Sequence, residues 1–231
     1  MKRYFTPFIS LLVGVFFSLI SIESYARDGR TYIKDAMKQR GACRTVAITE
    51  TNGDAMIFTN NGYAYSSVPT RMGERIKELN SDGKYITDIH LSESGNWIIL
   101  YENNGFTRAG LPYGLENLLL DWNNKGYKIL SASFDDDGHW IAISEEEYRA
   151  SDSSAQSWIK SGIYKYGKPI SSCISDGIAV IVYEKGYQIM GTAPKGLVSA
   201  IKNSSFKVRI IKATKTSWFI SDGESAYRYY M

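Results

Sequence analysis

Three side chains in this sequence, a thiol, an imidazole and a carboxylate, could together perform nucleophilic catalysis. Cys173, His90 and Asp88 form this candidate set, because a cysteine nucleophile needs a base to deprotonate it and an acid to orient that base. A protein that used them would be a cysteine-dependent hydrolase or transferase. The apolar neighbours of Cys173 instead predict a core cysteine. We therefore expect a non-catalytic protein and keep the enzyme as the alternative.

A second candidate site consists of polar residues on strands that are otherwise apolar. Seven of them align at two positions of the repeat described below, on one face: Thr45, Asp88, Ser131 and Ser172 at the first position, and His90, Ser133 and Lys212 at the second. Buried polar groups need hydrogen-bond partners, which here are each other, water or a ligand. The sequence predicts that these seven residues bind a ligand, and a wet channel without function is the alternative.

Metal and cofactor chemistry is not indicated by the motifs. The acidic run 135–137 precedes His139 in a hairpin turn, but its spacing is wrong for a calcium loop between two helices. No residues have the spacing of a zinc site, and "GTAPKG" (191–196) is better read as the start of a repeat helix than as a phosphate loop. We predict no metal and no cofactor. The run "SEEEYR" (144–149) is interpreted as a solvated loop.

The strands that would position these residues recur with a period of about 40 residues. Gly53, Gly95, Gly138 and Gly177 each open an apolar strand such as "GNWIILY", and "TSWFIS" continues the series. Another strand precedes each of these, and a turn such as "NGF" with a short third strand follows. Side chains on both faces of the middle strand are apolar, which predicts cover on both sides.

Each of the first four units then changes to a helical period. The expected helices begin at Pro69, at Pro112, at Asp152 or Ser153, and at Pro194, and Gly126 is an expected stop for the second of them. The fifth unit has no helix after it. A helix is predicted instead over residues 28–41, where Ile33 and Met37 repeat the spacing of Leu118 and Trp122.

These counts predict an α+β fold in which residues 27–231 form a single domain of five repeats. The N-terminal helix would complete the last repeat by docking beside the terminal hairpin. That arrangement gives a closed ring, similar to an αβ-propeller, of small antiparallel sheets with helices outside, and it leaves few exposed sheet edges. The alternatives are a β-propeller and an open repeat stack with a capping helix.

The first residues have the features of a signal peptide. Lys2 and Arg3 form a basic start, residues 8–22 are apolar, and small residues precede an expected cleavage after Ala26. The apolar run is too short for a comfortable membrane span, although an uncleaved anchor is the alternative. We predict a signal peptide over residues 1–26, a periplasmic or secreted protein, and no transmembrane segment after cleavage.

The net charge limits the classes of partner, and the two cysteines raise the question of a disulfide. The formal net charge is +3, which supports neither nucleic-acid binding nor a polybasic membrane patch. The two cysteines, Cys43 and Cys173, are compatible with a disulfide in an exported chain and equally with two buried free thiols.

One phrase of the repeat resembles a known family. In "GYKILSASFDDDGHWIAIS", Gly126, Tyr127, Ile129 and Trp140 match a Gly-Tyr-x-Ile strand followed by a tryptophan-containing strand, and the preceding unit adds Trp97, Gly105, Phe106 and Trp122. This pattern is similar to repeats in the C-terminal region of plant nuclear casein-kinase-1-like proteins and in exported bacterial proteins of unknown function. The resemblance implies the repeat and no catalytic residues. The unit plan is also similar, in topology only, to the five-unit rings of guanidine-modifying enzymes.

Taken together, the residues predict an exported binding protein that is not an enzyme. It would recognise a protein or a small ligand through the ring axis or the rim loops, as a periplasmic inhibitor or immunity-type protein does. Besides the cysteine-dependent enzyme, a structural envelope component is the other alternative.

Overall fold

The computed structural model describes residues 29–51, 53–175 and 177–231, and within them the chain forms five helices and fifteen strands. The helices are α1 (Gly29–Arg40), α2 (Thr70–Ser81), α3 (Leu115–Lys125), α4 (Ser153–Tyr166) and α5 (Leu197–Lys202). The strands of the first three units are β1 (Cys43–Ala47), β2 (Asp54–Phe58), β3 (Tyr63–Ser66), β4 (Ile86–Leu91), β5 (Trp97–Tyr101), β6 (Gly105–Ala109), β7 (Ile129–Phe134), β8 (Trp140–Ser144) and β9 (Tyr148–Ala150). Those of the last two are β10 (Pro169–Ser175), β11 (Ile178–Tyr183), β12 (Gly186–Gly191), β13 (Ile210–Ala213), β14 (Trp218–Ser221) and β15 (Tyr227–Tyr230).

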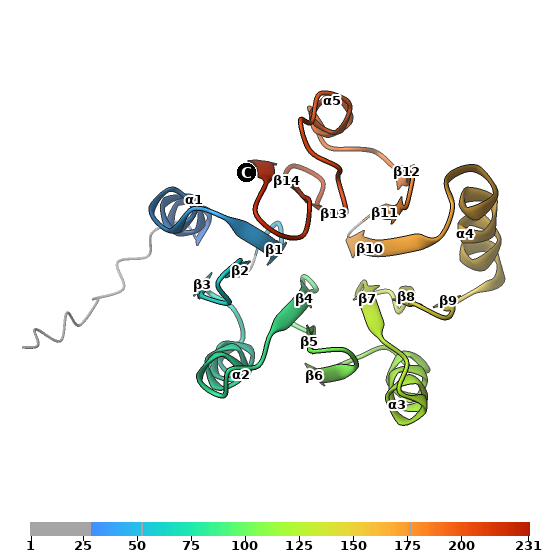
Figure 1. The fold of residues 1–231 in the computed structure, drawn as a ribbon, viewed down its shortest axis with the longest axis horizontal. Coiled ribbons are helices and arrows are strands. Elements are labelled where there is room, and N and C mark those ends of the chain that lie inside the picture. Colours follow the sequence, from blue (N-terminus) through green and yellow to red (C-terminus); the bar gives the residue numbers. More distant parts are fainter. Residues whose placement is uncertain (1–28, 52, 176) are drawn as a thin grey trace, which may run out of the picture.

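The strands form five separate antiparallel sheets of three strands, and each sheet keeps the chain order of its strands. The predicted α+β repeat of three strands and a helix is therefore confirmed. Figure 1 shows the five sheets around a common centre, with the first strand of each unit innermost and the helices at the periphery. Neighbouring first strands contact one another from β1 through β4, β7 and β10 to β13, and β13 and β14 also contact β1.

The apolar core is divided into five clusters, and each cluster lies between two neighbouring sheets and one helix. The middle strand β5 explains why: Trp97 and Ile99 pack in the cluster of α2, while Ile98 and Leu100 pack in the cluster of α3. Successive side chains of a strand point to opposite faces, so a strand that is apolar throughout serves two clusters. The equivalent strands β8 and β11 divide their side chains between two clusters in the same way.

Helix α1 belongs to the cluster between the first and fifth sheets. Ile33 and Met37 are buried there beside Phe58 of β2 and Phe219 of β14, and the hydroxyl of Tyr227 donates a hydrogen bond to the Met37 carbonyl at 3.5 Å. The opening helix therefore contacts the terminal hairpin. The indole of Trp218 points to the opposite face of β14 and packs in the cluster of α5 instead.

Two helices begin later than the sequence predicts. Proline was expected as the first residue at positions 112 and 194, but α3 begins at Leu115 and α5 at Leu197. Gly114 (φ 88°) and Gly196 (φ 83°) precede these helices in a left-handed conformation that favours glycine, so each proline opens a turn before its helix. Of the two residues predicted for the start of the fourth helix, Asp152 is the N-cap, because its carboxylate accepts the Ala155 N–H at 2.8 Å, and the helix begins at Ser153.

Two predictions concern the ends of the chain. The predicted signal peptide, its cleavage after Ala26 and the first residue of the predicted N-terminal helix lie outside the described residues. Among the helices that the structure describes, none combines the length and the apolar character that crossing a membrane requires.

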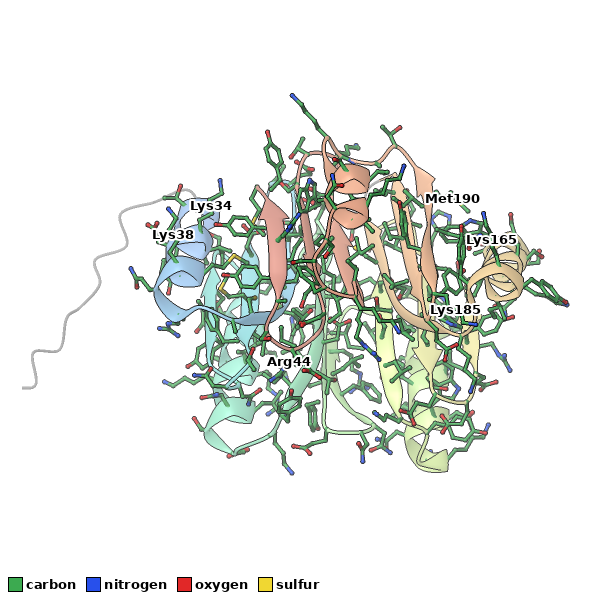
Figure 2. All side chains as sticks on the ribbon, turned by 45° about the horizontal axis from the view of Figure 1, so that its top comes forward. Lys34, Lys38, Arg44, Lys165, Lys185 and Met190 are labelled. Atoms are coloured by element: carbon green, nitrogen blue, oxygen red, sulfur yellow. The ribbon has the colours of Figure 1, made fainter. Side chains whose placement is uncertain are left out.

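The position of α1 leads to a stability test. Replacing the buried Met37 by Ala should lower the free energy of unfolding by about 2–5 kcal/mol, because a cavity would open between the first and fifth sheets. Urea denaturation followed by circular dichroism measures the change. Lys38→Ala is the matched control, since Lys38 is exposed on the same helix (Figure 2). Equal effects of the two substitutions would show that α1 is not part of the core.

Candidate functional site

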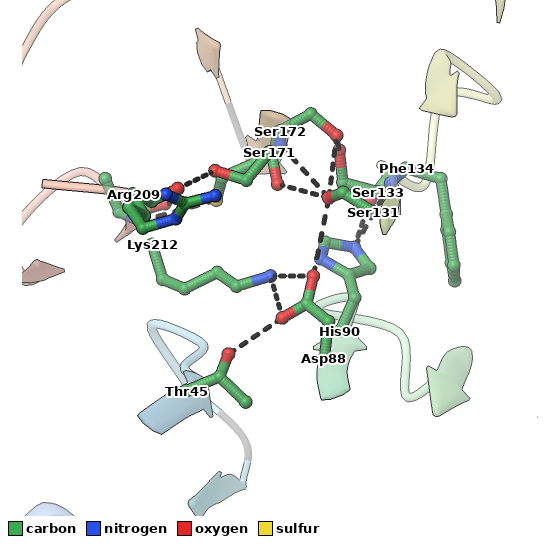
Figure 3. A network of polar contacts seen from close by, with 12 residues as sticks. Thr45, Asp88, His90, Ser131, Ser133, Phe134, Ser171, Ser172, Arg209 and Lys212 are labelled. Atoms are coloured by element: carbon green, nitrogen blue, oxygen red, sulfur yellow. Dashed lines mark hydrogen bonds and ion pairs between the residues drawn. The ribbon is translucent and has the colours of Figure 1, made fainter. Parts of the chain in front are cut away.

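The seven predicted ligand-binding residues lie together, where the innermost strands of the five sheets approach one another (Figure 3). We call them the axial cluster: Thr45, Asp88, His90, Ser131, Ser133, Ser172 and Lys212. Each of them is at most 4 % exposed, and they come from the innermost strands β1, β4, β7, β10 and β13. The central position expected for the first strands is therefore observed, but the side chains are covered.

The strongest interaction in the axial cluster is a buried ion pair. The Lys212 ammonium lies 2.8 Å from both carboxylate oxygens of Asp88, and the Thr45 hydroxyl donates to Asp88 at 2.7 Å. Lys212 is on β13 and Asp88 is on β4, so the pair joins two units that are not neighbours in the chain. Burying two charges is favourable only when their hydrogen bonds are also satisfied. Asp88 meets this condition, because it accepts hydrogen bonds from both Lys212 and Thr45.

Three serines form the other half of the axial cluster. The Ser131 hydroxyl lies 3.2 Å from that of Ser172 and 3.4 Å from an Asp88 oxygen, and it accepts the Ser172 N–H at 3.0 Å. The hydroxyls of Ser133 and Ser172 are 2.9 Å apart. The polar groups at the centre therefore serve as partners for one another.

The strand pairing corrects the predicted alignment of these residues. Thr45 pairs with Ile57, and Ser172 pairs with Ile181. The residue of β5 equivalent to these two isoleucines is Ile99, but Asp88 pairs with the next residue, Leu100. Thr45 and Ser172 therefore lie on the opposite face of their strands from Asp88 and Ser131, and the two kinds of residue meet across unit boundaries. The alignment was wrong because the turns between the first two strands differ in length from unit to unit.

His90 is the one titratable ring in the axial cluster. Its Nε2 lies 2.6 Å from the carbonyl oxygen of Phe134 and 3.2 Å from the amide nitrogen of the same residue. Burial, assisted by the nearby Lys212 charge, lowers the pKa of His90 to about 3. The imidazole is therefore neutral at physiological pH and is held by backbone rather than by Asp88.

The candidate set for cysteine catalysis is not assembled. The Cys173 thiol donates to the Ala213 carbonyl at 3.6 Å and accepts the Ala213 N–H at 3.4 Å, while His90 bonds to Phe134 and Asp88 to Lys212. Burial raises the pKa of Cys173, which is opposite to what an attacking thiolate needs. We therefore see a core thiol.

Both cysteines are free thiols, which is the second of the two predicted states, and no disulfide joins them. The Cys43 thiol donates weakly to the carbonyls of Thr45 and Ile57, each at 3.6 Å. Burial raises the pKa of Cys43 to about 12. Both buried thiols are therefore protonated at neutral pH.

A pocket of about 770 Å³ opens beside the axial cluster, at the ends where β7, β10 and β13 begin. We call it the mouth pocket. Asp88 and Ser171 reach its inner end, and the turns after β8, β11 and β14 surround it. The loop 144–149, interpreted from the sequence as merely solvated, contributes Ser144 to Tyr148 to its wall.

Sequence reasoning missed the mouth pocket because its residues share no motif. Lys128, Glu184 and Arg209 come from three different units, and each lies next to a strand end or a turn. The signal that could have found them is topological. In antiparallel sheets the turn after the middle strand lies at the same end as the start of the first strand, so these residues gather at one end of the five sheets.

The acidic turn 135–139 offers the one cluster of potential metal ligands found among the described residues. Side-chain atoms of Asp135, Asp137 and His139 lie within 4.8 Å of one another. Asp135 is already occupied, because it accepts the backbone N–H groups of Asp137 and His139 and binds the His139 ring nitrogen at 2.9 Å. These bonds are those of an aspartate that stabilises its own turn.

In comparisons with known proteins, no family model matches this chain and no curated protein matches it. The relation to the repeats of plant kinase-like proteins and of exported bacterial proteins therefore remains a prediction from the residues. What the protein does has to be inferred from its pockets and from the chemistry of the residues around them.

The ion pair of the axial cluster leads to a double-mutant prediction. Lys212→Met should destabilise the fold by about 3–5 kcal/mol, because it leaves Asp88 charged and buried without a cation. The pair Asp88→Asn with Lys212→Met should cost less than Lys212→Met alone. Urea unfolding at pH 7 measures both, with the exposed Lys207→Met as control. A small effect of Lys212→Met, no larger than that of Lys207→Met, would contradict the ion pair.

The pKa of His90 leads to a pH prediction. Between about pH 6.5 and pH 3 the unfolded chain binds a proton at His90 that the folded chain does not, so stability should fall as the pH is lowered through this range. His90→Gln should flatten the dependence, measured as urea midpoints between pH 7 and pH 5. His139→Gln, at the exposed histidine, should not flatten it. An unchanged slope in His90→Gln would refute the assignment.

Proposed function

We propose that this protein is an exported, non-catalytic binding protein that recognises a peptide segment or a comparable small ligand in the mouth pocket. The observation that carries the proposal is a pocket of about 770 Å³ with apolar and charged walls, built mainly from the third, fourth and fifth units beside the Asp88–Lys212 pair. Ligand sites in proteins are typically concave, of this size, and lined by apolar surface with a few placed polar groups.

The walls of the pocket define the ligand. Leu130, Ile163 and Ile170 supply apolar surface. Glu146 and Arg209, both exposed, supply opposite charges at the rim and form no ion pair among the described residues. A ligand with an apolar body and both an amine and a carboxylate, as a short peptide has, would satisfy this lining.

The proposal includes closure of the five units into a ring, which would keep the three walls of the pocket at fixed distances. Repeated contacts between neighbouring turns support it. The Glu93 carboxylate accepts from Thr51 of the preceding unit, and Asp136 accepts from Ser94 in the same way. Glu50 of the first unit accepts the N–H and hydroxyl of Thr216, in the fifth unit, each at 2.7 Å.

The lining of the mouth pocket favours binding over catalysis. Its residues include neither a cysteine nor a histidine, and the axial Cys173 is buried against Ala213. The carboxylates Glu145 and Glu147 are engaged by Lys128 at 2.7 Å and by Arg149 at 2.6 Å. These two positions therefore do not provide a pair of free carboxylates for acid–base chemistry.

A substitution that fills the pocket tests the proposal. A panel of dipeptides with one apolar side chain should contain members that raise the melting temperature of the wild-type protein. Leu130→Trp should abolish these shifts by occupying the apolar wall, while Leu120→Trp, on the exposed surface of α3, should preserve them. Shifts that persist in Leu130→Trp would place binding elsewhere. Absence of any shift in the wild type would exclude this ligand class and favour a structural envelope role.

A further inference from the structure

A second pocket lies on the other face of the molecule, between the third and fourth units. Its volume is about 570 Å³, and it is bounded by the turn between β7 and β8, the beginning of α4 and the ends of β10 and β12. Turns between the first two strands of a unit lie at the opposite strand ends from those around the mouth pocket. The two pockets share no residue, so this site is independent of the proposed function.

Carboxylates dominate the charge of this pocket. Asp135, Asp137 and Asp152 line it, and its lining contains no lysine or arginine. The ring of His139, which also lines it, is paired with Asp135 at 2.9 Å. The Ala155 N–H at the N-terminus of α4 lowers the pKa of Asp152, which keeps this carboxylate ionised. Asp137 is exposed and forms no side-chain hydrogen bond or ion pair among the described residues, so its charge is available to a ligand.

The remaining walls are aromatic and apolar. Trp140 and Trp158 are half-buried and both line the pocket, together with Ile178. Met190 is 45 % exposed at the end of β12, where it completes the apolar side (Figure 2). Indole rings beside carboxylates are the surroundings that bind organic cations, because the ring face and the carboxylate both attract positive charge. A bare metal ion would make no use of this apolar surface.

We propose that this pocket binds an organic cation, namely a protonated amine carried on an apolar body. The amine lies between the carboxylates of Asp137 and Asp152, and the apolar body lies against Trp140 and Trp158. The same chemistry belongs to a free arylalkylamine and to a lysine side chain of a partner protein. A free amine uses both parts of the pocket, whereas a lysine side chain uses the carboxylates and one indole face.

Isothermal titration of the full chain tests the proposal with three probes: phenethylamine, its neutral analogue 2-phenylethanol, and N-acetyl-lysine methylamide. Phenethylamine should bind, and the neutral alcohol should bind at least tenfold more weakly. Tighter binding of phenethylamine than of the lysine derivative identifies a free amine as the ligand, and the reverse order identifies a lysine side chain. Equal binding of the amine and the alcohol, or no binding of either amine, overturns the proposal.

Two variants locate the binding. Asp137→Asn combined with Asp152→Asn should weaken amine binding about tenfold, because exposed ion pairs contribute modestly and two are lost. Asparagine keeps the side-chain oxygen that caps α4, so folding is preserved, and circular dichroism verifies this. Glu74→Gln on the exposed surface of α2 removes a charge outside both pockets and should leave amine binding unchanged. Unchanged affinity in the double variant would overturn the proposal.

Discussion

The middle strand of each sheet is apolar on both faces, and the need to cover both faces determines most of this architecture. A single three-stranded sheet cannot bury the two faces of its middle strand, so each sheet requires a neighbour on either side. Each apolar cluster is shared by two sheets and one helix, as Trp97 and Ile98 of β5 illustrate by pointing into different clusters. The stability of one unit is therefore inseparable from that of the next.

The inner edges of the sheets are not joined by strand pairing, because no ladder of backbone hydrogen bonds connects one described sheet to another. Side-chain polar contacts connect the sheets instead: Thr45 with Asp88, Asp88 with Lys212, and Ser131 with Ser172. Such bonds are satisfied in only one relative placement of the strands, which apolar contacts alone would not enforce. The same bonds satisfy polar groups at the centre that would otherwise need water or a ligand as partners.

The repeat, the sheet order and the axial residues could be predicted because they depend on patterns that recur within the chain. Alternation identified the middle strands, and the recurring polar positions identified Asp88, Ser131 and Lys212 as neighbours at the centre. Contacts that depend on turn length could not be predicted, and Thr45 was assigned to the wrong face for this reason. The pockets also escaped prediction, because residues such as Arg209 and Trp158 meet their neighbours only through the placement of whole units.

Helix α1 also affects the order in which the molecule is assembled. The helix packs first on β2 and β3 of the neighbouring sheet, but its partners Phe219 and Tyr227 are nearly two hundred residues further along the chain, so its cluster is completed only by the last strands. Contacts of such long sequence separation form slowly, because the intervening chain loses much of its freedom when they close. Until then the side of this cluster that faces the fifth sheet is uncovered, and apolar surface exposed in this way during folding favours aggregation.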